Sequence, residues 1–180
     1  MDLRRLTFCA LFVALITVGT FIRIPIAGSV YTLQFLFTLL AGLILGAGLG
    51  MTSVAVYVLM GLLGVPVFAM GGGPSYLLQP TFGYLLGFAV QAYFCGYFSR
   101  NRGTGNFLHL LTVNLGGMLL VYAFGIAWFY VVSNYIIDAP ISAWAALFYC
   151  GIVQAPPDIV LCIAAAKLAQ RCRQAGIWLA

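Results

Sequence analysis

The stretch Gly71–Phe88 separates two apolar segments with backbone that cannot continue a regular helix. It contains three consecutive glycines and two prolines. Glycine loses much backbone entropy in a helix, and proline lacks the amide hydrogen that a helix needs. Because lipid cannot hydrogen-bond exposed backbone, such a break must lie at the water interface or fold inward over a protein-lined cavity. Hydrogen-bonding groups for a ligand are expected there from Tyr76, Gln79, Thr81 and Tyr84.

The composition assigns most of the surface of this chain to lipid. Of its 180 residues, 64% are hydrophobic and 6% are charged, and the mean hydropathy is +1.10. A soluble domain carries roughly 25% charged residues. We therefore predict one integral membrane domain over residues 1–180. The net charge of +5 does not indicate a nucleic-acid partner, because the eight basic residues lie at segment ends and not on one face.

A transmembrane span needs roughly 20 apolar residues, and prolines, glycine clusters and charges divide the chain into six expected spans. Their approximate limits are Leu6–Ile22, Phe35–Leu49, Thr52–Phe68, Gly83–Phe98, Leu108–Asn134 and Ser142–Arg173. The expected fold class is thus an all-α membrane protein with six transmembrane helices. The first apolar run also fits a signal peptide, but no small-residue cleavage site precedes Arg23, which favours a retained helix.

The arginines orient the expected bundle. Six spans place both termini on one side of the membrane, and most arginines fall on that side, whereas Arg23 falls on the other. The positive-inside rule makes the arginine-rich side cytoplasmic, so we expect both termini in the cytoplasm and a multi-pass protein of the plasma membrane. The arginines of the cytoplasmic side are Arg4, Arg5, Arg100, Arg102, Arg171 and Arg173.

Small residues recur at intervals of four in the first two spans. Gly42, Gly46 and Gly50 would form one stripe on the second span, and Ala10 and Ala14 a shorter stripe on the first. Such stripes let membrane helices approach closely. They are compatible with internal packing or with the docking of a separate protein.

The segment Gly46–Ser53 has the glycines of a phosphate-binding loop but lacks its lysine. Without that cation the segment provides no site for nucleotide phosphates, so no ATP hydrolysis by this chain is predicted. The five cysteines contain no C-x-x-C pair and the chain has one histidine, so no metal site and no cofactor is predicted either.

Asp158, directly after Pro156 and Pro157, is the strongest candidate for a ligand contact. An ionisable group in a membrane segment costs about 2.5–3.5 kcal/mol on insertion scales, so it normally faces a cavity or a partner. The alternative role is that of a helix cap, in which the carboxylate accepts hydrogen bonds from backbone amides after the break.

Other polar residues in or beside the spans are weaker candidates. Arg23 would attract an anionic solute or a lipid phosphate. Of five amide side chains, some must form interhelical hydrogen bonds, and we expect two or three to reach the cavity. These five are Gln34, Gln79, Gln91, Asn114 and Gln154.

Several motifs together resemble the BioY family of biotin transporters, the substrate-binding S components of energy-coupling factor transporters. The most specific is the run from Pro80 to Phe88, and the pair Pro157-Asp158 matches a late proline and aspartate of that family. Further similar runs are Phe21-Ile22-Arg23-Ile24-Pro25, Tyr31-Thr32-Leu33-Gln34, Leu39-Leu40-Ala41-Gly42 and Gly61-Leu62-Leu63-Gly64-Val65-Pro66-Val67-Phe68.

The resemblance implies a six-helix S-component-like bundle with an outward-facing vitamin cavity, covered by the loop between the first two helices. It implies that Asp158 contacts the ureido end of biotin and that residues around Gln79 contribute to the cavity. It also implies partnership with a transmembrane coupling protein and two cytoplasmic ATPases, with Ala10 and Ala14 as the docking surface for the coupling protein.

One position departs from the family pattern. The family commonly has a lysine three residues after the aspartate, where this chain has Leu161. Arg23 is hypothesised to offset this loss by holding a carboxylate. The alternatives to a biotin-binding subunit are an S component for another small vitamin or precursor, an intramembrane enzyme, and a purely structural membrane protein. The enzyme is disfavoured, because Asp158 has no histidine, second acid or cysteine at motif spacing.

Overall fold

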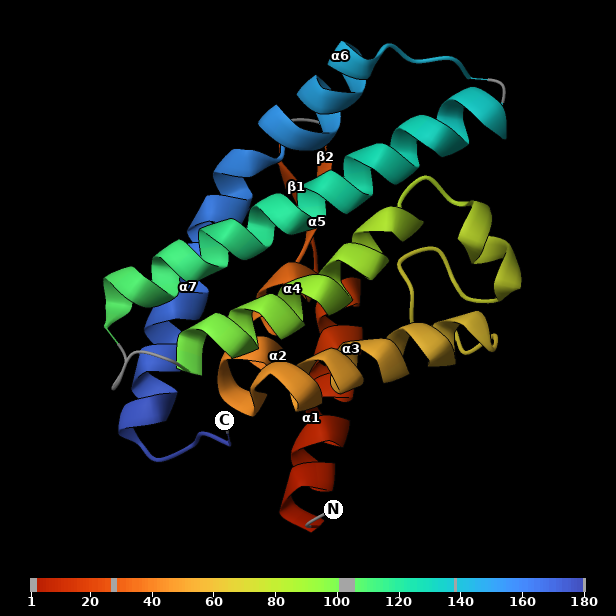
Figure 1. Ribbon diagram of the computed structural model, residues 1–180. Coiled ribbons are helices and arrows are strands. Elements are labelled where there is room, and N and C mark those ends of the chain that lie inside the picture. The colour runs from red at the N-terminus through yellow and green to blue at the C-terminus, as the bar shows by residue number, and fades with distance from the viewer. Residues whose placement is uncertain (1–2, 27–28, 101–105, 138, 180) are drawn as a thin grey trace.

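A computed structural model of the chain describes residues 3–26, 29–100, 106–137 and 139–179. Arg102 of the predicted arginine-rich side and Asp138 lie outside these residues. The described chain is built from helices joined by short connections (Figure 1). With residues 143–174 taken as one interrupted helix, it has six helical segments, so the predicted all-α class is confirmed. They are α1 (Leu3–Phe21), α2 (Gln34–Leu45), α3 (Ala47–Leu62), α4 (Phe82–Arg100), α5 (Phe107–Tyr135) and the segment of α6 (Ala143–Leu147) and α7 (Ala155–Gln174).

The segment between α1 and α2, expected as an irregular loop, contains a two-stranded antiparallel hairpin. Strand β1 (Arg23–Ile26) pairs with β2 (Ser29–Thr32), with Arg23 opposite Thr32. Both strands contain β-branched residues, which favour extended backbone. The amide of Leu33 donates to the Ile22 carbonyl at 3.3 Å, so the hairpin returns the chain to the end of α1.

The boundary between α2 and α3 differs from the predicted one. The second helix was expected to continue to Leu49, but it ends at Leu45, and α3 begins at Ala47. Gly46 connects them with φ at 83°, a conformation that residues with a side chain rarely adopt. The predicted single stripe of glycines is therefore wrong, since Gly42 and Gly50 belong to different helices.

The third helix begins and ends earlier than predicted. It starts at Ala47 and not at Thr52, it ends at Leu62 and not at Phe68, and Gly64 follows with φ at 101°. The chain then forms an irregular segment that contains the 3₁₀ helix η1 (Pro74–Leu78) before α4 begins. This segment is the predicted break, and Phe68 and Tyr76 anchor it by packing their rings 4.4 Å apart.

The final helix is interrupted where the two prolines predict it. After α6 the backbone forms a π-helical turn, η2 (Phe148–Ile152), and α7 starts at Ala155 with proline in its first turn. Proline in the first turn costs no hydrogen bond, because the amides there lack a helical partner. The interruption places Asp158 in the first turn of α7.

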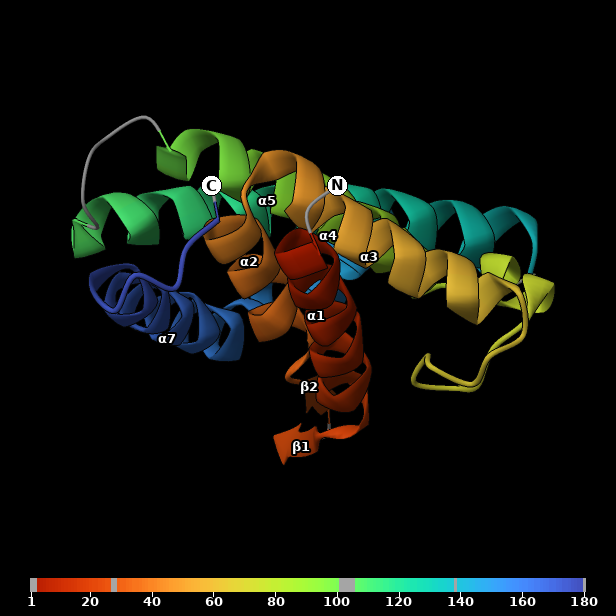
Figure 2. The same cartoon turned by 90° about the horizontal axis from the view of Figure 1, so that it is seen from below.

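Helix α2 forms the centre of the fold. It contacts α1, α3, α4 and α7, and most of its residues are buried. Figures 1 and 2 show α2 among these helices and show both chain ends on the side away from the hairpin. A helix that is apolar and buried nearly all round is typical of the interior of a bundle.

Among the described residues, three helical segments are long and apolar enough to cross a membrane: residues 3–21, 107–135 and 143–174. Helices α2 and α3 are apolar but shorter, with 12 and 16 residues. Together with the scarcity of charge, these helices define an all-α membrane protein. The number of passes and the side of the termini remain predictions.

Candidate functional site

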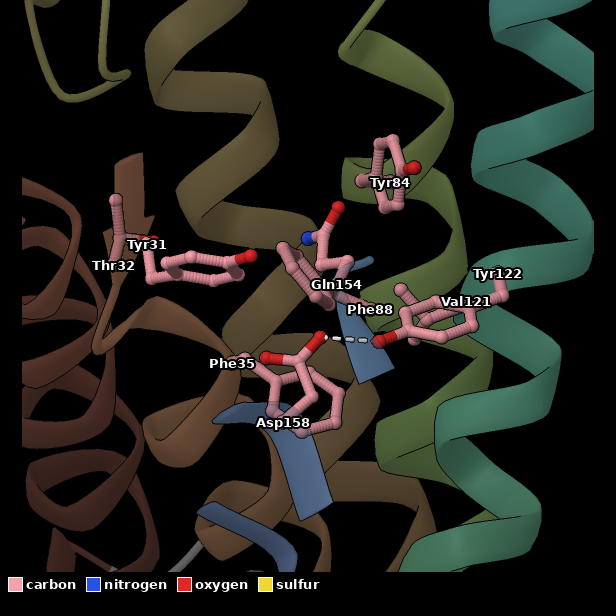
Figure 3. A pocket seen from close by; sticks show the side chains of 9 residues that line it. All are labelled: Tyr31, Thr32, Phe35, Tyr84, Phe88, Val121, Tyr122, Gln154 and Asp158. Carbon is pink, nitrogen blue, oxygen red and sulfur yellow. Dashed lines mark hydrogen bonds between the residues drawn. The ribbon is translucent and has the colours of Figure 1, made fainter. Parts of the chain in front are cut away.

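Asp158, in the first turn of α7, faces α5, and 5% of its surface is exposed. The Tyr122 hydroxyl donates a hydrogen bond to its Oδ2 at 2.7 Å (Figure 3). No side chain caps the first turn of α7, whose N-cap residue is Gln154. The alternative of a capping aspartate is therefore not supported, because the hydrogen bond that this carboxylate forms comes from the facing helix.

Aromatic rings form the walls around this carboxylate. Phe35 of α2 and Phe88 of α4 pack with their centroids 6.2 Å apart. Tyr31 of the hairpin and Tyr84 of α4 stand on either side of Gln154 in Figure 3. The carboxylate thus lies below a space with flat aromatic walls and several polar groups, which suits a small planar solute.

The interrupted helix holds both of these tyrosines. The Tyr84 hydroxyl donates to the Cys150 carbonyl at 2.9 Å, and the Tyr31 hydroxyl donates to the Val153 carbonyl at 3.2 Å. Carbonyls of this kind are free to accept because the regular ladder of helical hydrogen bonds is broken around η2. The break therefore fixes the walls of the site.

Two adjoining cavities occupy this region. The first, which we call the inner cavity, has a volume of about 70 Å³ and is lined by Tyr31, Thr32, Phe35, Tyr84, Phe88, Val121, Tyr122, Gln154 and Asp158. The second, the outer cavity, has a volume of about 260 Å³ and is lined by Thr32, Gln34, Ala69, Met70, Tyr76, Thr81, Tyr84, Leu85, Phe88 and Gln154. The two cavities share four lining residues, Thr32, Tyr84, Phe88 and Gln154, and therefore lie next to each other. Of the residues that line either, only Asp158 is charged.

The cavities bring together six of the predicted ligand contacts. Asp158 lines the inner cavity, Tyr84 and Gln154 line both, and the outer one is lined by Gln34, Tyr76 and Thr81. Gln34 and Gln154 are thus the two predicted amides that reach a cavity.

Gln91 and Asn114 line neither cavity and are fully buried between helices. Gln91 accepts a hydrogen bond from Thr38 at 3.0 Å, which joins α4 to α2. Asn114 donates to the Cys162 carbonyl at 3.0 Å, which joins α5 to α7. Gln91 and Asn114 thus form the interhelical hydrogen bonds that were expected of some of the five amide side chains.

Gln79 and Arg23 lie beside the site without lining it. The Gln79 carbonyl accepts from the Trp128 indole at 3.2 Å, which holds the start of α4 against α5. Arg23 is exposed and donates to the carbonyl of Ala69, a residue of the outer cavity. The guanidinium therefore links the hairpin to the irregular segment at the rim of that cavity.

Ala10 and Ala14 are both exposed on α1. The buried face of that helix is formed by other residues: Cys9, Phe12, Ile16, Gly19 and Thr20. The alanine stripe therefore forms no buried face within the described chain, and its role in docking stays a prediction.

Sequence reasoning missed Tyr122 and Tyr31, although both line the inner cavity. The structure shows one feature that points to Tyr122, the close packing of a glycine of α5 against Tyr84. A Cβ at Gly125 would lie 2.5 Å from the Tyr84 ring, so a glycine on α5 accommodates the tyrosine that forms the wall. Tyr122 lies three residues before this glycine, on the same face of α5.

Other hollows of the described chain have different linings. One, of about 300 Å³, lies beside the Gly46 turn and is lined by Arg5 and Arg100 but by no acidic side chain. Another, of about 420 Å³, is an apolar groove on α5 lined by Ala123, Phe124, Ala127, Trp128 and Val131. Its lining offers no charged side chain to a polar solute. Among the described residues no group of histidine, cysteine or acidic side chains is arranged to hold a metal ion.

The helices and the site define a class of protein before any comparison is made. Apolar helices enclose a buried carboxylate, aromatic walls and a small internal space. The class is that of integral membrane proteins with an internal site for a small solute.

Residues 1–177 match the family model described as the BioY family, and the chain belongs to this family. A probable biotin transporter BioY of Lysinibacillus sphaericus is 41% identical over 167 residues, covering 92% of this chain and 85% of that protein. A biotin transporter BioY of Thermotoga maritima is 37% identical over 137 residues, covering 76% and 78%.

The fold also matches a solved structure. The crystal structure of the S-component for biotin from an ECF-type ABC transporter superposes with a TM-score of 0.81 and 26% identity, covering 95% of this chain and 91% of that one. The relatives are transporters, which points to a role other than that of an enzyme.

Proposed function

We propose that this chain is the substrate-binding S component of an energy-coupling factor transporter that captures biotin with high affinity for uptake. The observation that carries the proposal is the Asp158 carboxylate, buried at the base of an aromatic cavity in a fold that matches an S component for biotin. We propose further that residues 1–180 form one integral membrane domain and act by binding and release, without enzymatic chemistry.

The inner cavity has groups that suit the ureido ring of biotin. That ring presents two N–H donors, and Asp158 is an acceptor whose Oδ2 already receives one hydrogen bond from Tyr122. Hydrogen bonds to an ionised acceptor are roughly twice as strong as those between neutral groups. The rings of Tyr31, Phe35 and Phe88 would cover the flat faces of the bicyclic head.

A solute of this size needs more space than the inner cavity provides. Ligand cavities are typically about 300–1,000 Å³, whereas the inner cavity measures about 70 Å³ and the outer one about 260 Å³. Biotin would therefore extend through both, and the side chains between them, such as Gln154, would move aside.

The departure at Leu161 changes how Asp158 is held. Leu161 provides no cation one turn after the aspartate, and the neutral Tyr122 hydroxyl supplies a hydrogen bond to the carboxylate. An S component for another small vitamin or precursor with N–H donors is the alternative that this departure favours.

For transport, we propose that the chain works with a transmembrane coupling protein and two cytoplasmic ATPases, since Gly46–Ser53 lacks the lysine of a phosphate-binding loop. In this arrangement the protein spans the plasma membrane six times, with both termini in the cytoplasm. The exposed alanines of α1 would face the coupling protein.

Titration of the purified protein against a panel of small vitamins tests the ligand. We expect saturable binding of labelled biotin, retained through detergent extraction and without conversion to a product. Binding of a different vitamin with biotin inactive would support the alternative S component. Turnover in the absence of other subunits would instead support an enzyme.

Bulky side chains on the exposed face of α1 test the docking surface. We expect Ala10→Trp and Ala14→Trp to abolish biotin uptake by cells that contain the coupling protein and the ATPases, because a close helix contact tolerates no large residue. Biotin binding to the purified variants should be unchanged, since neither alanine lines a cavity. Leu119→Trp, at a lipid-exposed position of α5 with 64% exposure and away from α1, is the matched control. Normal uptake by both alanine variants would contradict this docking surface.

A further inference from the structure

Gln34 is a buried amide without a partner at the edge of the outer cavity. It is the first residue of α2, and 6% of its surface is exposed. Its Nε2 atom forms no hydrogen bond in the described chain, and its side chain lines the outer cavity. Leaving a buried polar group unpaired costs about 1–3 kcal/mol, so such a group at a cavity indicates a ligand that satisfies it.

The amide nitrogen of Gln34 requires an acceptor. A glutamine side chain carries two N–H donors, and a half-turn of the amide exchanges its nitrogen and oxygen, so the group can present a donor to the cavity. The Nε2 of Gln91, the buried amide of the neighbouring α4, also has no partner in the described chain, but Thr38 holds its oxygen and Gln91 lines neither cavity, so only Gln34 can offer a free donor to a ligand there.

The charges around the outer cavity favour an anionic acceptor. Helix α2 starts at Gln34, and no side chain caps that end. The unpaired amides of a helix start carry a partial positive charge that favours anions. The described lining of the outer cavity contains no acidic residue, and Arg23 touches its rim through Ala69. The inner cavity has the opposite preference because it contains Asp158.

We propose that Gln34, at the start of α2, forms the subsite for the carboxylate end of the bound solute. The solute then lies with its N–H donors at Asp158 and its acid group in the outer cavity. This inference rests on the proposed function and adds a substrate class: small acids with a donor-bearing ring at the opposite end. Neutral amides of the same acids are expected to be poorer ligands.

This assignment differs from the hypothesis that Arg23 holds the carboxylate. Arg23 is exposed and already donates to the Ala69 carbonyl. Its guanidinium would therefore attract the carboxylate of the solute electrostatically, from the rim of the cavity and across solvent. Its contribution should be screened by salt, whereas a buried hydrogen bond from Gln34 should not be.

Binding of biotin and of its uncharged amide to variants of Gln34 tests the proposal. We expect Gln34→Leu to weaken the binding of biotin about 10- to 100-fold, which is the effect of losing a hydrogen bond to a charged group. The same variant should weaken the binding of biotinamide, the uncharged amide, only severalfold. Gln34→Glu should change the ratio of the two affinities more strongly, because the introduced carboxylate repels the carboxylate of biotin and accepts a hydrogen bond from the amide of biotinamide. The readout is the ratio of the two dissociation constants at low and at high salt.

Three controls separate the possible failures. Asp158→Asn should weaken both ligands by the same factor, since both carry the same ureido ring. Arg23→Ala should weaken biotin more than biotinamide, by a smaller factor that disappears at high salt. Unchanged melting temperatures of the Gln34 variants exclude misfolding.

The proposal is overturned if both Gln34 variants, folded, change the ratio of the two dissociation constants by less than about threefold. If the wild-type protein binds neither ligand, the proposed function itself fails.

Discussion

Replacing Asp158 with asparagine is expected to lower biotin affinity about 10- to 100-fold, the range for hydrogen bonds to a charged acceptor. The substitution removes the charge and preserves the shape of the side chain. Asp158 is the only charged residue that lines either described cavity, so no other carboxylate there can replace it. Isothermal titration with biotin, or dissociation rates where binding is too tight to titrate, measures the effect.

Two companion variants make this result specific. Tyr122→Phe leaves the carboxylate in place and removes the hydroxyl that lies 2.7 Å from it, so we expect a smaller loss, of about tenfold or less. Gln174→Ala, at the exposed end of the same helix, should bind normally. If the folded Asp158→Asn variant binds biotin with wild-type affinity, the carboxylate of Asp158 does not contact the ligand.

The second large effect is expected at Gly42, where α2 meets α4. A Cβ at Gly42 would overlap the carbonyl oxygen of Ala92 and lie 3.0 Å from the Ala92 Cα atom. Backbone atoms cannot rotate away as a side chain can, so α2 and α4 would have to separate. Overpacking of this kind typically costs about 1–3 kcal/mol and sometimes more. We expect Gly42→Ala to lower the melting temperature in detergent by several degrees, and Gly42→Leu to prevent folding.

Gly48 provides the matched control for Gly42. It is an exposed glycine near the start of α3, and nothing lies within 4 Å of a Cβ at this position. Alanine in a helix is more favourable than glycine by roughly 0.5–1 kcal/mol, so Gly48→Ala should leave the melting temperature unchanged or raise it. If Gly42→Ala and Gly48→Ala change the melting temperature equally, α2 and α4 do not approach as closely as described.

The fold could largely be predicted because prolines, glycines and charges mark the ends of membrane helices. The interruption directly before Pro156 and Pro157 and the irregular segment at Gly71–Gly73 are close to where these residues indicate them. The turn at Gly46 could not be placed, because Gly42, Gly46 and Gly50 are identical in sequence. Only packing decides which of three equivalent glycines forms the turn.

The candidate site was harder to predict than the fold. Asp158 stands out because a carboxylate in an apolar segment needs a reason to be there. Tyr122 does not, because aromatic residues are common in membrane helices for other reasons. Gln34 and Gln91 are chemically the same, and which one faces a cavity depends on the neighbouring helices, which a single sequence does not reveal.

The interrupted last helix has a mechanical consequence. Tyr31 from the hairpin and Tyr84 from α4 stand on either side of the solute space, yet both hydroxyls attach to carbonyls of one short stretch, Cys150–Val153. Two walls of the site thus share one support, and a displacement of this stretch would act on both tyrosines.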